Sequence, residues 1–325
     1  MKCIGKLKLI FIFTIICSIL LTGCIIRPEP VVSLYETENY NRSIYQGNLY
    51  AEQLCVSDED VSIPSFAGDE SLHAAALFNI TDNTVEYADH IHDKLFPAST
   101  TKILTALVAM NTCNLDDIVT VSSSAAASSF AADEQVCGLI EGDQLTLRAL
   151  LYGMLLYSGN DNATAIAEYV GGSLENFSKM MNDQAEELLA TNTNFITPNG
   201  LHDEAHYTTA YDLYLIFNEC IKNQEFLDII SSSSYTADIT GSDGTVRQVV
   251  WEPTSYYARG VAVLPTGATV IGGKTGYTEQ AGNCLILLDK DENDQLFVSI
   301  VIGADTKDLL YSDMTDIINQ IPNLN

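Results

Sequence analysis

Apolar residues recur at helical spacing through the middle of the chain and at strand spacing on both sides of it. Downstream of Ser99, the residues Ile103, Leu104, Leu107 and Val108 are spaced as on one face of a helix, and they predict a largely buried one. The same pattern predicts five further helices, over 145–157, 162–170, 174–189, 209–221 and 309–321.

Segments with strand character flank this helical region. Before it, residues 74–80 and 85–91 surround the turn "TDNT" and predict a hairpin. Strands from both ends with helices between them indicate an α/β chain of the α+β type, in which distant segments form one sheet around a helical insertion. About 260 residues can bury an ample core as one domain or two tightly joined lobes. The later strands are expected at 245–251, 268–278, 283–290 and 296–304, with "DEND" as the turn of the last hairpin.

The first residues have the layout of an export leader. Lys2, Lys6 and Lys8 precede an apolar run over 9–21, which is too short for a comfortable membrane span. The run ends in "LTGC", which resembles the bacterial lipoprotein processing box and implies a lipid-modified Cys24. The alternative is a plain signal peptide or a core segment. We therefore predict a leader over 1–23, an extracytoplasmic tether over 24–65 and a folded domain over 66–325.

Charge and cysteine content exclude some classes of function. After the leader, 12 Lys and Arg stand against 43 Asp and Glu, a formal charge of −31, which repels nucleic acid and anionic lipid. Five cysteines follow Cys24 with wide spacing and no Cys-x-x-Cys pair, so a disulfide framework or a zinc knuckle is not expected. They are Cys55, Cys113, Cys137, Cys220 and Cys284.

A serine and a lysine stand at the start of the first predicted helix. Ser99 and Lys102 are three residues apart and would share one helix face. A serine hydroxyl becomes a good nucleophile when a nearby base takes its proton, and an amine can do so if burial or a second cation lowers its pKa. The alternative is an N-capping serine followed by a solvated lysine.

Two further short patterns strengthen the catalytic interpretation. "SGN" places Ser158 and Asn160 in a turn between two predicted helices, although alone it is an ordinary helix N-cap. "KTG" places Lys274 in an otherwise apolar strand, where a buried lysine is costly without an anionic partner. Gly276 in the same strand allows a second backbone to approach closely.

Together, "PASTTK", "SGN" and "KTG" resemble the active-site motifs of the penicillin-binding proteins and serine β-lactamases. The surrounding segments over about 70–305 resemble the low-molecular-mass D-alanyl-D-alanine carboxypeptidases, with Asn162 as the only local oddity. The resemblance implies a penicillin-binding/β-lactamase-like fold with a mainly antiparallel five-stranded sheet. It implies a serine-type carboxypeptidase that removes the terminal D-alanine from peptidoglycan stem pentapeptides and is acylated by β-lactams.

The resemblance also implies a role for each matching residue. Ser99 would attack the carbonyl of the penultimate D-alanine with Lys102 as general base. Ser158 would relay a proton to the leaving nitrogen, and Asn160 would orient Lys102 and the substrate amide.

The strand motif would bind the other end of the substrate. Lys274 and Thr275 would hold the terminal carboxylate, with Gly276 between the substrate-binding residues of the strand. The backbone N–H groups of Ser99 and Tyr277 would form the oxyanion hole. No metal or organic cofactor is expected.

Three other interpretations remain open. "HDEAH" could pass for a zinc helix, but Asp203 stands where zinc proteases have glutamate. A serine β-lactamase would need a deacylating glutamate, and the nearest candidate, Glu186 in "EELLA", has Ala190 in the asparagine position. A silent domain that only binds β-lactams or peptidoglycan is disfavoured by the intact motifs. The expected location is outside the cytoplasm, on the membrane through lipidated Cys24.

Overall fold

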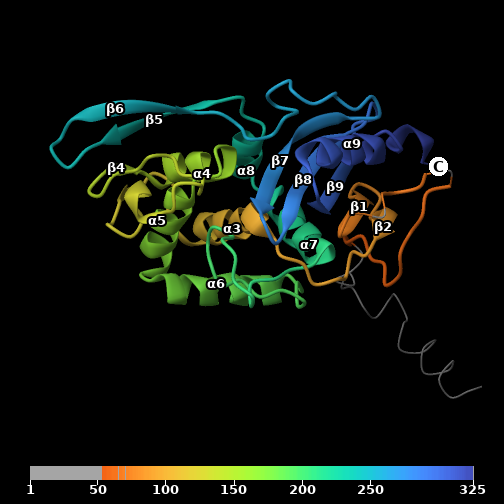
Figure 1. Cartoon of the computed structure of the whole chain (residues 1–325), viewed down its shortest axis with the longest axis horizontal. Coiled ribbons are helices and arrows are strands. Elements are labelled where there is room, and N and C mark those ends of the chain that lie inside the picture. The colour runs from red at the N-terminus through yellow and green to blue at the C-terminus, as the bar shows by residue number, and fades with distance from the viewer. Residues whose placement is uncertain (1–52, 65, 70, 325) are drawn as a thin grey trace, which may run out of the picture. The chain divides into compact units, whose positions relative to one another are not determined.

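Strands from the two ends of the chain meet in one antiparallel sheet, of order β2-β1-β9-β8-β7 (Figure 1). The computed structural model describes residues 53–64, 66–69 and 71–324. β1 pairs with both β2 and β9, so the N-terminal hairpin extends the sheet built by the C-terminal strands. This confirms the expected five-stranded sheet. Its strands are β1 (Ala74–Asn79), β2 (Thr84–Asp89), β7 (Thr269–Thr278), β8 (Gly282–Lys290) and β9 (Leu296–Ala304).

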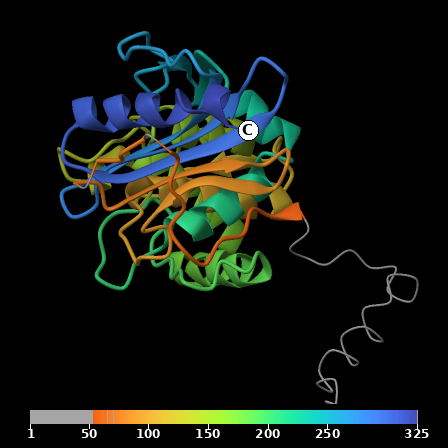
Figure 2. The same ribbon diagram turned by 90° about the vertical axis from the view of Figure 1, so that its right-hand side faces the viewer.

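The two central C-terminal strands are almost continuously apolar because both faces of the sheet are covered. In β8, Ile286 faces a core shared with the helical region, whereas Leu285 and Leu287 face a second core. Helix α9 (Lys307–Ile318) covers this second face, and the other helices lie on the opposite side (Figure 2). The sheet is therefore the middle layer of three.

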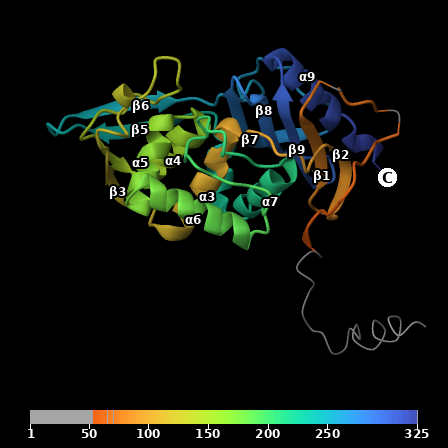
Figure 3. The ribbon, with the colours of Figure 1, turned by 60° about the horizontal axis from the view of Figure 1, so that its bottom comes forward.

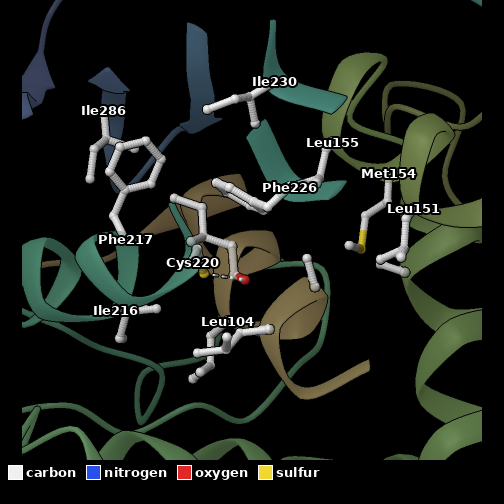
Figure 4. Close-up of a cluster of buried hydrophobic side chains, with 14 of the residues drawn as sticks. Leu104, Leu151, Met154, Leu155, Ile216, Phe217, Cys220, Phe226, Ile230 and Ile286 are labelled. Atoms are coloured by element: carbon white, nitrogen blue, oxygen red, sulfur yellow. Dashed lines mark hydrogen bonds between the residues drawn. The ribbon is translucent and has the colours of Figure 1, made fainter. Parts of the chain in front are cut away.

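The helical region lies between the two halves of the sheet in the sequence, as expected. Helix α3 (Lys102–Thr112) is buried along most of its length, from Lys102 to Ala109, and is surrounded by other helices (Figure 3). The larger core contains side chains from several helices and from the sheet, among them Leu104 of α3, Phe217 of α7, Phe226 of α8 and Ile286 of β8 (Figure 4). The other helices of this region are α4 (Leu147–Leu156), α5 (Asn160–Gly171), α6 (Leu174–Glu187), α7 (Ala210–Cys220) and α8 (Gln224–Ile230).

A second antiparallel sheet, of order β3-β4-β5-β6, was not expected from the sequence. The strand predicted at 245–251 belongs here and not to the large sheet, because Val246–Trp251 pairs with Tyr235–Thr240. The long β5–β6 ribbon extends over the helical region (Figure 1). The four strands are β3 (Ile118–Thr120), β4 (Gln144–Thr146), β5 (Tyr235–Thr240) and β6 (Val246–Trp251).

Residues 53–64 fall in the predicted tether, yet they pack against the domain. The Cys55 N–H donates to Tyr214 Oη at 2.9 Å, and Val61 forms a bridge with Ala88. The predicted leader and Cys24 lie outside the described residues. Among the described helices, none has the length and apolar character needed to cross a membrane. All five cysteines that follow Cys24 are free thiols.

Candidate active site

Ser99 lies in a short 3-10 helix, η2 (Ala98–Thr101), which leads directly into α3. It therefore does not cap α3 through its side chain, and the capping alternative is not what the structure shows. Ala98 before it has a positive φ of 48°, a conformation that is strained for a non-glycine residue. The sequence thus places the serine on a tight turn at the start of a buried helix.

Lys102 is the fully buried neighbour of this serine. Its Nζ lies 2.8 Å from Ser99 Oγ, 2.8 Å from Asn160 Oδ1 and 2.6 Å from the Asn199 carbonyl oxygen. Burial, followed by the positive charge of Lys274, holds the pKa of the Lys102 amine well below its usual value. A neutral amine in contact with a serine hydroxyl can accept its proton.

The "SGN" turn lies between α4 and α5, as the sequence predicted. Ser158 has a positive φ of 66°, and Asn160 is the first residue of α5. The Asn160 N–H donates to the Gln135 carbonyl at 2.8 Å, which ties this turn to the loop that precedes Cys137. Both side chains are buried; Ser158 contacts Lys274, and Asn160 contacts Lys102.

Lys274 belongs to β7 and is only 1% exposed. Its Nζ lies 2.9 Å from Ser158 Oγ and 2.7 Å from the Thr275 carbonyl. Burial lowers the pKa of Lys274 to about 7. Within the described residues it has no carboxylate partner, so its cationic form is available to an incoming anion.

Two glycines bring these segments close together. A Cβ on Gly276 would lie 3.1 Å from Ser99 N, so β7 passes directly beside the backbone of the serine. A Cβ on Gly200 would lie 1.8 Å from the Ala98 carbonyl oxygen, and Gly200 itself has a φ of +81°. The close approach at Gly276 is the one expected from the sequence.

Ser99, Ser158, Asn160, Thr275, Gly276 and Tyr277 all line one cleft of about 750 Å³. The two lysines lie beneath it and reach its wall through Ser99 and Ser158. The Tyr277 side chain is 60% exposed, so it stands at the mouth. The structure therefore brings all eight predicted site residues of the domain together, while Cys24 is outside the described residues.

Sequence reasoning missed three residues that hold this site. Asn199 supplies a backbone carbonyl for Lys102 from 97 positions further along the chain. Thr254 Oγ1 contacts Thr275 Oγ1 at 2.6 Å. The buried Asp161 carboxylate accepts from the N–H groups of Cys137 and Leu139, and burial raises its pKa. No local pattern in the sequence marks contacts of this kind.

The two histidines of "HDEAH" do not form a zinc helix. Both ring nitrogens of His206 contact protein groups, with Nε2 2.9 Å from Thr101 Oγ1 and Nδ1 accepting from the Ile196 N–H at 3.0 Å. Burial lowers the pKa of His206 to about 4. Elsewhere in the described residues, Asp60, Asp89 and His90 have metal-ligand geometry at the surface, but none of them lines the cleft.

The family profile of the D-alanyl-D-alanine carboxypeptidases matches residues 64–306. The chain belongs to this family of serine peptidases. DacF, the D-alanyl-D-alanine carboxypeptidase of Bacillus subtilis, is 32% identical over 241 residues, which cover 72% of this chain and 57% of DacF. DacD of Escherichia coli is 30% identical over 275 residues, covering 82% of this chain and 67% of DacD. This chain thus spans little more than half of DacF.

A solved structure shares the fold. The Streptomyces K15 DD-transpeptidase superposes with a TM-score of 0.72 at 28% identity, and the match covers 83% of this chain and all of that one. The resemblance seen in the motifs is therefore confirmed at the level of family and fold. Within the three-layer architecture of this chain, the cleft lies between β7 and the helical region.

Proposed function

We propose that the protein is a serine-type carboxypeptidase that removes the terminal D-alanine from peptidoglycan stem pentapeptides. The observation that carries this proposal is the 2.8 Å contact between Ser99 Oγ and the fully buried Lys102 amine, at the base of a cleft walled by β7. Family membership supports the same reaction. β-Lactams would acylate the same serine.

In the first half-reaction, Ser99 Oγ attacks the carbonyl of the penultimate D-alanine while Lys102 accepts the hydroxyl proton. The lowered pKa of Lys102 supports this role, because it raises the fraction of neutral amine that can accept the proton. The negative oxygen that develops would be stabilised by the N–H groups of Ser99 and Tyr277. Gly276 supports this arrangement, since it allows β7 to lie against the Ser99 backbone.

The proton must then reach the leaving amine as the C–N bond breaks. Ser158 contacts Lys274, and Asn160 contacts Lys102, so each active-site lysine has one of these two side chains as a hydrogen-bond partner. We assign Ser158 the relay of the proton and Asn160 the orientation of Lys102 and of the substrate amide. Water then attacks the acyl-serine ester and releases the shortened peptide.

The terminal carboxylate of the substrate would bind at Lys274 and Thr275. A buried cation without a carboxylate partner in the described structure is costly, and an incoming carboxylate would remove that cost. Thr275 is half-buried in the cleft wall and offers a hydroxyl at the same place. The site would therefore select peptides with a free C-terminal carboxylate.

The test is the release of D-alanine from an N-acyl-D-Ala-D-Ala peptide by wild type and by Ser99→Ala. We expect release from wild type and a loss of at least about 10⁴-fold in the variant, as for other serine nucleophiles. Ser312→Ala, at an exposed position of α9, is the matched control and should keep full activity. Release by a folded Ser99→Ala protein would place the nucleophile elsewhere.

A serine β-lactamase is less well supported by the site. Glu186, the nearest match to a deacylating glutamate in the sequence, is exposed at the end of α6 and does not line the cleft. Rapid, repeated hydrolysis of benzylpenicillin would nevertheless favour that alternative.

We further propose that the chain is exported and anchored to the outer face of the cell membrane through lipidated Cys24, with 1–23 as leader, 24–65 as tether and 66–325 as catalytic domain, the end of the tether (53–64) being packed on the domain. The "LTGC" box and the basic, apolar leader support this location. Cys24→Ala should move the full-length protein from the membrane fraction to the soluble fraction of expressing cells. Retention of the variant in the membrane fraction would point to another anchor.

A further inference from the structure

In the part of the chain that the structure describes, most Lys and Arg side chains without a carboxylate partner lie at the cleft. Ten Lys and Arg lie in the described residues, and five of them form ion pairs with Asp or Glu. The other five Lys and Arg form no ion pair with a carboxylate of the described residues. Four of these five lie in or beside the catalytic cleft, and Lys94 lies elsewhere. These four are Lys102, Lys274, Arg259 and Lys307.

The two cations that the proposed mechanism does not use share one aromatic ring. Lys307 Nζ lies 5.6 Å, and the Arg259 guanidinium carbon 5.9 Å, from the ring centre of Tyr256. Tyr311 stacks on the same ring at 4.8 Å with an interplanar angle of 9°, and its hydroxyl accepts from the Tyr256 N–H at 2.8 Å. We call these four residues the Tyr256 cluster. Its aromatic pair is fixed, while both cations are exposed.

The Tyr256 cluster stands on the side of the cleft where the leaving residue would lie. Tyr256, Lys307 and Tyr311 line the same cleft as Ser99. Two residues before Tyr256, the Thr254 hydroxyl contacts the Thr275 hydroxyl at 2.6 Å. Since Thr275 is proposed to hold the carboxylate of the leaving residue, the side chain of that residue would have the Tyr256 cluster as its wall.

The opposite side of the cleft has the opposite charge. Asp133 and Glu134 line the cleft next to Gln135, whose carbonyl accepts from the Asn160 N–H. The exposed cations at the cleft thus lie on the leaving side, in the Tyr256 cluster. Glu279 also lines the cleft and Asp308 follows Lys307 in α9, but neither acid forms an ion pair with Lys307 in the described structure. A negatively charged group would be attracted to this side and repelled by the other.

We propose that the Tyr256 cluster is a subsite for a second negative charge on the leaving residue, so that the enzyme prefers to release a D-amino acid with two carboxylates over a neutral one of the same size. The inference rests on the proposed carboxypeptidase function. The chemistry does not change: the amide C–N bond breaks, the acyl–serine bond forms, and the Ser99 proton ends on the leaving amine.

The experiment compares N-acyl-D-Ala-D-Xaa peptides in which Xaa is Glu, Gln or Ala. Glu and Gln have the same shape, so the ratio of their kcat/KM values isolates the charge. One exposed charge pair is typically worth a factor of about two to five. Because the subsite has two cations, we expect a ratio of about five or more for wild type in low salt. The ratio should decrease as salt screens the cations.

The double variant Lys307→Gln, Arg259→Gln should bring the Glu/Gln ratio to about one and leave kcat/KM for D-Ala-D-Ala within about threefold of wild type. Both side chains are exposed, so the fold should tolerate the change. Lys290→Gln is the matched control, because Lys290 pairs with Asp294 outside the cleft, and it should keep the wild-type ratio.

A wild-type Glu/Gln ratio of kcat/KM near one would contradict the proposed subsite, and so would a high ratio that the double variant retains. In either case, turnover of the D-Ala-D-Ala peptide would still support the carboxypeptidase function. Absence of release from all three peptides would overturn the proposed function, and the subsite with it.

Discussion

Asp289 offers a quantitative test of the packing between the large sheet and its second core. It lies in β8, is fully buried, and its Oδ2 accepts from Ser299 Oγ at 2.6 Å. Its other oxygen, Oδ1, has no hydrogen-bond partner in the described structure. Burial raises the pKa of Asp289 from 3.8 to about 7. The perturbation is Asp289→Asn, which keeps the shape and removes the titration.

The sign of the effect follows from proton binding. Between pH 3.8 and about pH 7, folded Asp289 keeps a proton that the unfolded chain has lost, so the stability of wild type falls as pH rises through this window. At about 1.4 kcal/mol per pH unit, the loss reaches about 4 kcal/mol at most, and it levels off above pH 7. Asparagine avoids this loss. The variant should therefore be more stable than wild type by about 2 to 4 kcal/mol at pH 8 and nearly equal at pH 4.5.

Urea unfolding at several pH values between 4.5 and 8 measures this difference directly. The chain from residue 51 onward is suitable, since every described helix and strand and both cores lie within it. Asp294→Asn is the control, because Asp294 is exposed and should alter stability by less than about 0.5 kcal/mol at each pH. A difference between Asp289→Asn and wild type that stays constant or decreases as pH rises would refute the reasoning.

Two further predictions concern the site. The value of kcat/KM for a D-Ala-D-Ala peptide should fall as pH rises above about 7, because free Lys274, with a pKa of about 7, loses the charge that holds the carboxylate. Lys274→Arg should abolish this alkaline fall, because arginine stays protonated, and an unchanged midpoint in the pH profile would assign the fall to another group. Gly200→Ala should lower kcat/KM by about 10²-fold, because the new Cβ would displace the Ala98 carbonyl beside Ser99. Gly244→Ala has the same backbone strain, with a φ of +82°, but open space around the Cβ, so equal activity losses in the two variants would argue against the clash.

The large sheet could be predicted because its strands carry strong local signals. β8 and β9 were recognised at nearly their observed bounds from continuous apolar runs, and the β1–β2 hairpin from its turn. The second sheet was missed because β3 and β4 have three residues each, too few for a period to show. Helix α8, with seven residues, was missed for the same reason. Short elements depend on tertiary packing more than on sequence pattern.

In the candidate site, too, the residues marked by a local sequence pattern could be predicted, whereas those that depend on tertiary contacts could not. Ser99, Lys102 and Lys274 were found because each is a polar residue at an unusual place in an apolar pattern. Asn199 was missed because it contributes a backbone carbonyl to a lysine 97 positions away. The contact of Thr254 with Thr275 likewise depends on how the loop after β6 folds back, which no local pattern reports.

The most direct test of the account is an intact-mass time course of the chain from residue 51 onward mixed with benzylpenicillin, with Ser99→Ala alongside. We expect one penicilloyl adduct on wild type, lasting minutes or longer, and none on the variant. An adduct on Ser99→Ala, or no adduct on a folded wild type, would contradict the central claim that Ser99 is the nucleophile of a penicillin-binding carboxypeptidase.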